Sequence, residues 1–233
     1  LMPLGMTGAD FVWRESFDPP VPYGYNLKGE AIPVYVYPEK ASGGLFATAE
    51  DIARFILAGM PGSSQTVLPA ERVSQLYEPA ARDMGLYSLV FDAYGLGHYI
   101  EFLAGGQLAV SHGGQGTGWM THFHAVPEAG AALVILTNSQ RSWPFIASVL
   151  SDWASWNGFA SIGMERILLG QRILWSVIGL IWFGLFWQLF RLLAGLIGKK
   201  RRFAPSAKPV RVIQVLQRSE ERRVGKECRA RWS

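Results

Sequence analysis

The sequence predicts an α/β fold in which an antiparallel sheet with packed helices is followed by one transmembrane helix. Three observations carry this prediction: extended segments joined by turns between residues 107 and 138, helix-start signals on both sides of them, and a long uncharged apolar run around residue 180. At 233 residues the chain is long enough to bury a core. We expect the domain that contains the sheet to occupy residues 1–160.

Three extended segments predict the centre of the sheet. Gln107–Ser111 comes first, and Gly118–Val126 follows with side chains that alternate between two faces. Ala131–Thr137 is nearly all apolar, which is typical of a strand covered on both faces. The PEAG sequence between the last two segments has the residues of a tight turn, so it predicts a hairpin.

Helix signals flank these segments. Thr48 is a good N-cap, and Glu50 and Asp51 place negative charge in the first turn, where it complements the helix dipole. A second, short helix is expected over Leu68–Tyr77. After the hairpin, Trp143–Trp156 has the pattern of an amphipathic helix that covers one face of the sheet.

The step His112-Gly113-Gly114-Gln115-Gly116 is the candidate functional site. Glycines have no Cβ, so a ligand can approach the main chain closely, and exposed N–H groups there can stabilise an oxyanion. The neighbouring imidazole can orient a substrate or carry a proton. The structural alternative is a glycine bend beside a surface histidine. A phosphate loop is excluded because no helix follows the glycines.

Composition excludes several other kinds of site. His122 and His124 have a spacing that can hold zinc, but no Asp, Glu or Cys of the hairpin completes a site, so we expect no metal and no cofactor. Cys228 is the only cysteine, which excludes an internal disulfide. The net charge is +4, but the basic residues gather in the last third of the chain, so we expect no nucleic-acid partner.

The C-terminal part predicts a membrane anchor. Ile173–Phe190 has no charge over 18 residues, about 27 Å as a helix, and we expect the transmembrane helix over residues 167–198. A buried helix of a soluble protein is the alternative. Because the cluster KKRR follows at once, the positive-inside rule places the basic tail, 199–217, in the cytoplasm and the sheet outside. Residues 218–233 resemble translated adapter sequence and are excluded from fold reasoning.

Several short motifs occur in one order over about residues 1–155, and together they resemble the beta-lactamase-like serine hydrolases: class C beta-lactamases, penicillin-binding DD-peptidases and related esterases. The motifs are Pro3-Leu4-Gly5-Met6, Ser42-Gly43-Gly44-Leu45 with Thr48 and Asp51, Tyr94-Gly95-Leu96-Gly97, His112-Gly113-Gly114 with Gly118, and the Pro127 turn leading into Val134–Asn138.

The resemblance implies acyl transfer on an amide, lactam or ester. His112-Gly113-Gly114 would be the third active-site motif, which is Lys or His, then a small residue, then Gly. His112 would assist substrate orientation and proton transfer, and the N–H of Gln115 would form one half of the oxyanion hole. The substrate would be a small molecule or peptidoglycan-like, and the protein would lie in a bacterial plasma membrane with its hydrolase-like part outside.

The family's nucleophile motif is absent from these residues. No serine has a lysine three positions later, and no tyrosine begins a Tyr-x-Asn step. In the family both motifs lie upstream of the step that matches Pro3–Met6. We therefore expect a chain without the N-terminal half of its domain, inactive alone toward a fluorescent penicillin. The alternative is a non-catalytic, membrane-anchored binding or regulatory module.

Overall fold

The computed structural model describes residues 1–65 and 67–198. The segments expected as a basic tail, 199–217, and as adapter-like sequence, 218–233, lie outside the described residues. The chain divides into two units, 1–176 and 177–233, and the helix α5 (Glu165–Ile197) begins in the first and continues in the second.

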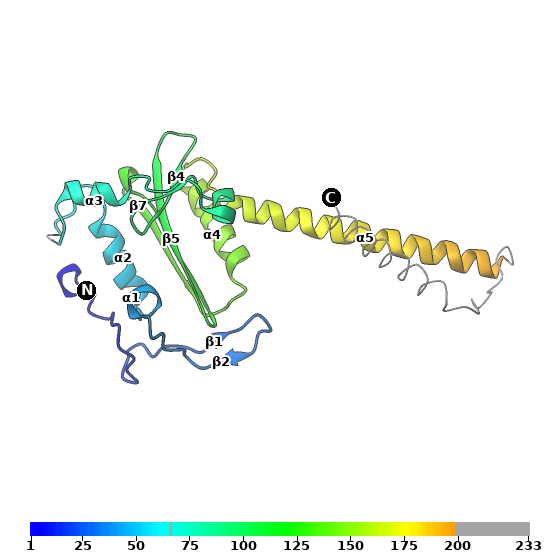
Figure 1. The fold of residues 1–233 in the computed structure, drawn as a ribbon, viewed down its shortest axis with the longest axis horizontal. Coiled ribbons are helices and arrows are strands. Elements are labelled where there is room, and N and C mark those ends of the chain that lie inside the picture. Colours follow the sequence, from blue (N-terminus) through cyan, green and yellow to red (C-terminus); the bar gives the residue numbers. More distant parts are fainter. Residues whose placement is uncertain (66, 199–233) are drawn as a thin grey trace, which may run out of the picture. The chain divides into compact units, whose positions relative to one another are not determined.

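The first unit is built on a five-stranded antiparallel meander, in which each strand pairs with the next along the chain (Figure 1). Its strands are β3 (Ala93–Tyr94), β4 (Tyr99–Phe102), β5 (Leu108–Gly116), β6 (Trp119–Val126) and β7 (Ala131–Thr137). A separate pair consists of β1 (Gly24–Tyr25) and β2 (Ala31–Ile32). The sheet and the hairpin after β6 confirm the prediction, except that the glycine-rich step continues β5 instead of ending it.

Helices lie on both faces of this sheet, with α2 and α4 on opposite sides in Figure 1. The α-helices of the first unit are α1 (Lys40–Gly43), α2 (Ala49–Ala58), α3 (Ala70–Leu76) and α4 (Trp143–Trp156), and short 3-10 turns cover Met2–Leu4, Gly85–Leu89 and Pro127–Ala129. The helix predicted after the hairpin is therefore confirmed residue for residue.

The start of α2 follows from local chemistry. Thr48 Oγ1 accepts the N–H of Asp51 at 3.1 Å, and the Asp51 carboxylate accepts the N–H of Thr48 at 3.1 Å, which makes a reciprocal capping box. Asp51 also accepts the N–H of Gly8 at 3.2 Å, so it ties the N-terminal segment to the helix. Burial acts to raise the pKa of Asp51, but these hydrogen bonds hold it below its ordinary value.

The two faces of the sheet carry different cores. On the α4 face, Ile146, Ala147 and Leu150 of the helix are fully buried against the sheet. On the α2 face the buried cluster is smaller and is centred on Ile56 and Val110. The side chains of β6 alternate between these faces as predicted.

Strand β7 is covered less completely than its apolar composition suggests. It is the last strand of the sheet, so it has a strand neighbour on one side only within the described residues. Only Ile135 of this strand is buried, and Leu136 is 39% exposed. As expected, the apolar run is covered on both faces: Val134 packs against the cluster on the α2 face and Leu133 against the cluster on the α4 face. The cover is incomplete, because most residues of the strand remain partly accessible.

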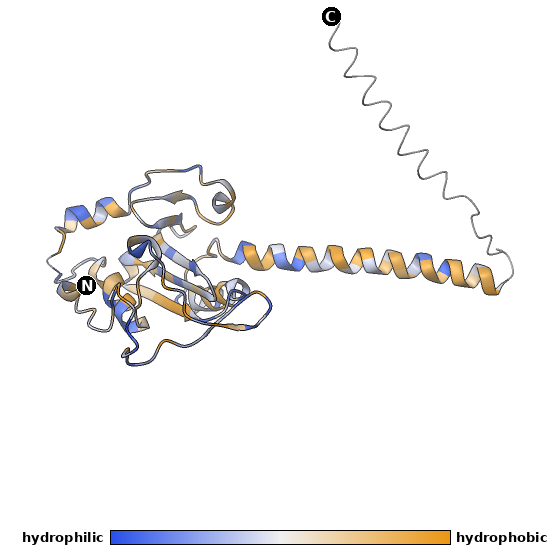
Figure 2. Cartoon of the chain, turned by 60° about the horizontal axis from the view of Figure 1, so that its bottom comes forward, coloured by the Kyte–Doolittle hydropathy of each residue, from blue (hydrophilic) through white to orange (hydrophobic). Residues whose placement is uncertain are grey.

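Helix α5 is long and apolar enough to cross a membrane, and it is the one such helix in the described part of the chain. None of the membrane-length window is buried inside the protein. Figure 2 shows that most residues of the helix are hydrophobic. Its first turn belongs to the first unit: Arg166 donates to the Leu89 carbonyl oxygen at 3.0 Å, and Ser151 donates to Glu165 at 3.0 Å.

Candidate functional site

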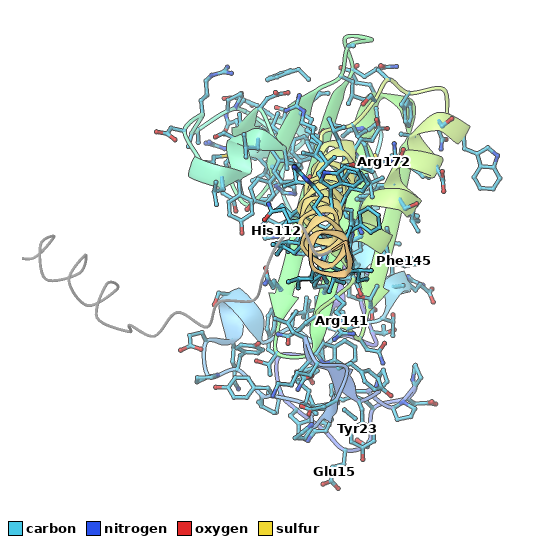
Figure 3. All side chains as sticks on the ribbon, turned by 90° about the vertical axis from the view of Figure 1, so that its right-hand side faces the viewer. Glu15, Tyr23, His112, Arg141, Phe145 and Arg172 are labelled. Carbon is cyan, nitrogen blue, oxygen red and sulfur yellow. The ribbon has the colours of Figure 1, made fainter. Side chains whose placement is uncertain are left out.

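Strand β5 has an open edge at His112. Its ladder with β4 ends at the pair Tyr99–Ser111, whereas its ladder with β6 continues to the pair Gly116–Trp119. From His112 onward, β5 therefore has a strand neighbour on only one side among the described residues. Figure 3 shows His112 on the sheet. The predicted site residues thus lie on one strand edge that can receive a ligand.

The hydrogen-bonding phase of β5 decides which N–H groups face this edge. The Leu103 N–H donates to the Gln107 carbonyl oxygen at 2.9 Å, so Gln107 directs its main-chain groups toward β4. Along an antiparallel strand the direction of these groups alternates from residue to residue. Because the register of β5 has no bulge, Gly113 and Gln115 also direct their N–H groups toward the β4 side. The β4 ladder has ended there, so both N–H groups are placed to bind an oxyanion.

Two tyrosines surround the His112 ring. Tyr94 Oη lies 3.3 Å from His112 Nε2, and the Tyr99 ring stacks on the imidazole with centroids 5.5 Å apart. Burial lowers the pKa of His112, while a backbone hydrogen bond to Gly113 acts in the opposite direction. The imidazole is therefore neutral at pH 7, the form that can accept a proton.

Packing contacts explain why glycine occupies two positions of this strand. A Cβ on Gly113 would lie 3.3 Å from both His122 and Trp143, so this residue allows α4 to pack closely. A Cβ on Gly116 would lie 3.0 Å from Tyr37 Oη, which crosses the end of the strand. These contacts explain part of the pattern without any ligand. The structure nevertheless keeps Gly114 and Gln115 exposed beside His112.

A second polar cluster lies on the opposite face of the sheet, buried under α4. It contains Glu101, Ser111, His122 and His124, none more than 4% exposed. The His124 Nδ1 atom lies 3.9 Å from Glu101 Oε1, and the other carboxylate oxygen accepts the Gly163 N–H at 2.6 Å. Hydroxyl, imidazole and carboxylate are the groups of a catalytic triad, but full burial closes this cluster to substrate.

The titration of the buried cluster follows from its burial. Burial raises the pKa of Glu101 to about 7, with the Gly163 hydrogen bond acting in the opposite direction. It lowers the pKa of His122 to about 3 and that of His124 to about 4. Both imidazoles are neutral at pH 7. Within the described residues no group of three or more His, Cys, Asp or Glu can hold a metal ion.

Sequence reasoning found His112, Gly113, Gly114 and Gln115, and the structure places them consecutively on the open edge of β5. It did not find Tyr94, whose hydroxyl oxygen lies 3.3 Å from the imidazole. Tyr94 lies 18 residues before His112, in the motif Tyr94-Gly95-Leu96-Gly97, and no role was predicted for its side chain. Glu101 was also overlooked, although an acid inside the apolar YIEFL run was the available signal.

Comparison with known proteins gives one family. A family model described as Beta-lactamase matches residues 1–148. Among curated proteins no match was found.

Two solved structures have a similar fold. An octameric penicillin-binding protein homologue from Pyrococcus abyssi is 23% identical, with a TM-score of 0.57, and the match covers 69% of this chain and 36% of that one. A class C beta-lactamase is 17% identical, with a TM-score of 0.50, and the match covers 61% of this chain and 45% of that one. The match therefore spans less than half the length of either structure.

Proposed function

Because the chain belongs to the beta-lactamase family, we propose that β5 forms one wall of a serine-hydrolase site. The reaction is acyl transfer on an amide, lactam or ester, in a small-molecule or peptidoglycan-like substrate. The open edge of β5 supports this proposal most directly. It offers the Gln115 N–H to the carbonyl oxygen of the substrate, beside the neutral imidazole of His112.

In this proposal each residue has one task. The Gln115 N–H stabilises the oxyanion of the tetrahedral intermediate, and the N–H of the nucleophile supplies the second donor. His112 orients the substrate and assists proton transfer. The exposed main chain at Gly114 lets the substrate approach the strand. The proposal requires a serine and a lysine from outside these 233 residues, which contain neither Ser-x-x-Lys nor Tyr-x-Asn.

A proline substitution on the strand edge tests the oxyanion role of the Gln115 N–H. In the protein that carries the nucleophile motif, Gln115→Pro removes the N–H donor and is expected to lower kcat/KM for a nitrophenyl ester or nitrocefin about 100-fold. An edge strand tolerates proline where the N–H faces solvent. The control Gln115→Ala keeps the donor and is expected to leave kcat/KM within about twofold. Equal effects of the two variants would show that the N–H is not used.

The non-catalytic alternative makes a different prediction about the gene. If the encoding sequence has no Ser-x-x-Lys and Tyr-x-Asn upstream, the chain is a binding or regulatory module, and a fluorescent penicillin leaves no covalent label at any serine. If both motifs are present, the chain belongs to an active hydrolase, and labelling disappears when that serine is replaced.

We further propose that α5 anchors the hydrolase-like part outside a bacterial plasma membrane, with the C-terminus in the cytoplasm. The length of α5 and the basic cluster after it support this orientation. In a Cys228→Ser background, Glu15→Cys is expected to react with an impermeant maleimide in intact cells. Ser206→Cys is expected to react only after the membrane is permeabilised. The reverse pattern would exclude this topology.

A further inference from the structure

Two tyrosine side chains contact the ring of His112. Its Nε2 atom is 3.3 Å from Tyr94 Oη, and one face stacks on Tyr99 with an interplanar angle of 22°. Tyr99 in turn stacks on Phe91, with centroids 4.2 Å apart, and on Tyr87, at 5.5 Å. This column of rings limits how far the imidazole can turn.

The Tyr94 backbone is also fixed. Its N–H donates to the Ala81 carbonyl oxygen at 2.8 Å, and its own carbonyl oxygen accepts the N–H groups of Ala80 and Ala81 at 2.9 Å each. On its other side it pairs with Tyr99 in the β3–β4 ladder. The phenol therefore presents its hydroxyl at one position, next to the imidazole nitrogen.

We propose that Tyr94 is the positioning residue of the site: its O–H donates to Nε2 of His112, which keeps the proton of the neutral imidazole on Nδ1. The catalytic part of this inference rests on the proposed hydrolase function. A neutral histidine has two tautomers, and a donor at one nitrogen selects the tautomer whose proton is on the other.

Tyr94→Phe and Tyr99→Phe test the proposal as a matched pair. Each removes one hydroxyl and keeps its ring, but only Tyr94 contacts an imidazole nitrogen. The chain has four histidines, so selective ¹⁵N labelling of the full chain in detergent micelles resolves each one, with His112→Gln used for assignment. Nitrogen chemical shifts report both the tautomer and the pKa.

We expect Tyr94→Phe to raise the pKa of His112 by about half a unit or more, because the lost bond stabilised the neutral form. The Nε2–H tautomer should also become populated. Tyr99→Phe should leave both quantities unchanged. A His112 pKa that stays constant or falls in Tyr94→Phe would overturn the proposal, as would an equal response to both variants.

A kinetic measurement separates this inference from the hydrolase proposal. In the protein that carries the nucleophile, Tyr94→Phe is expected to move the acidic limb of the kcat/KM profile to higher pH, whereas Tyr99→Phe leaves it in place. If the tautomer shifts but Gln115→Pro has no effect, the Tyr94–His112 pair stands and the hydrolase role falls. If Gln115→Pro lowers kcat/KM but Tyr94→Phe leaves the tautomer unchanged, the hydrolase role stands and the Tyr94–His112 proposal falls.

Discussion

Gly163→Ala is expected to lower the free energy of unfolding of the first unit by about 4 kcal/mol or more. An added Cβ would collide with the Val90 carbonyl oxygen and lie 2.8 Å from the Val90 carbonyl carbon and 3.0 Å from a Glu101 carboxylate oxygen. The backbone has no room to withdraw, because Ile162 and Met164 on either side are each 1% exposed. The substitution would also disturb the 2.6 Å hydrogen bond from the Gly163 N–H to Glu101.

Gly170→Ala is the matched control. It makes the same chemical change inside α5, where a Cβ would meet no atom within 4 Å, and alanine is favoured over glycine in a helix by about 1 kcal/mol. Urea unfolding of the full chain in detergent micelles, followed by near-ultraviolet circular dichroism, compares the two variants. Equal midpoints would mean that the segment before α5 is not packed against the sheet.

The sequence predicted correctly those elements that depend on residues close together in the chain. The Thr48–Asp51 capping box and the bounds of α4 follow from residues within a few positions of each other. The sequence predicted strand β5 only as far as Ser111 and placed the glycine-rich step, 112–116, at its end. The structure keeps it extended because each of its residues pairs with β6. Tertiary pairing decided this element.

The candidate site was predictable in part for the same reason. His112 and Gln115 stand in one recognisable motif, so the sequence alone placed them together. The open edge depends on where β4 ends, which no property of the motif contains. The contact between Glu101 and Gly163 joins residues 62 positions apart. Such a pairing follows only from the folded arrangement, and so does the burial of His122 and His124.

Acid is expected to destabilise the protein through the buried histidines His122 and His124. Burial lowers the pKa of His122 to about 3 and that of His124 to about 4, against about 6.5 in an unfolded chain. The unfolded state therefore binds more protons, so stability falls as pH drops below about 6.5. Full protonation would cost about 8 kcal/mol for the pair together. Glu101 acts in the opposite sense: its pKa is raised to about 7, so its contribution is present at low pH and is lost as pH rises toward 7.

The slope of stability against pH separates these contributions. Near pH 5.5, these three side chains together contribute an uptake of about one proton on unfolding, because the gain at the two histidines is partly offset by the loss at Glu101. This uptake adds about 1 kcal/mol per pH unit to the slope. Glu101→Gln removes the offset, so the slope should become steeper by about 1 kcal/mol per pH unit, and the variant should be more stable than wild type above pH 7. Its amide oxygen can still accept the Gly163 N–H. His124→Gln should instead reduce the slope.

Urea midpoints measured between pH 4.5 and 8 for the wild type, Glu101→Gln and His124→Gln test these expectations. Parallel curves of stability against pH would show that these side chains are not buried as a neutral cluster.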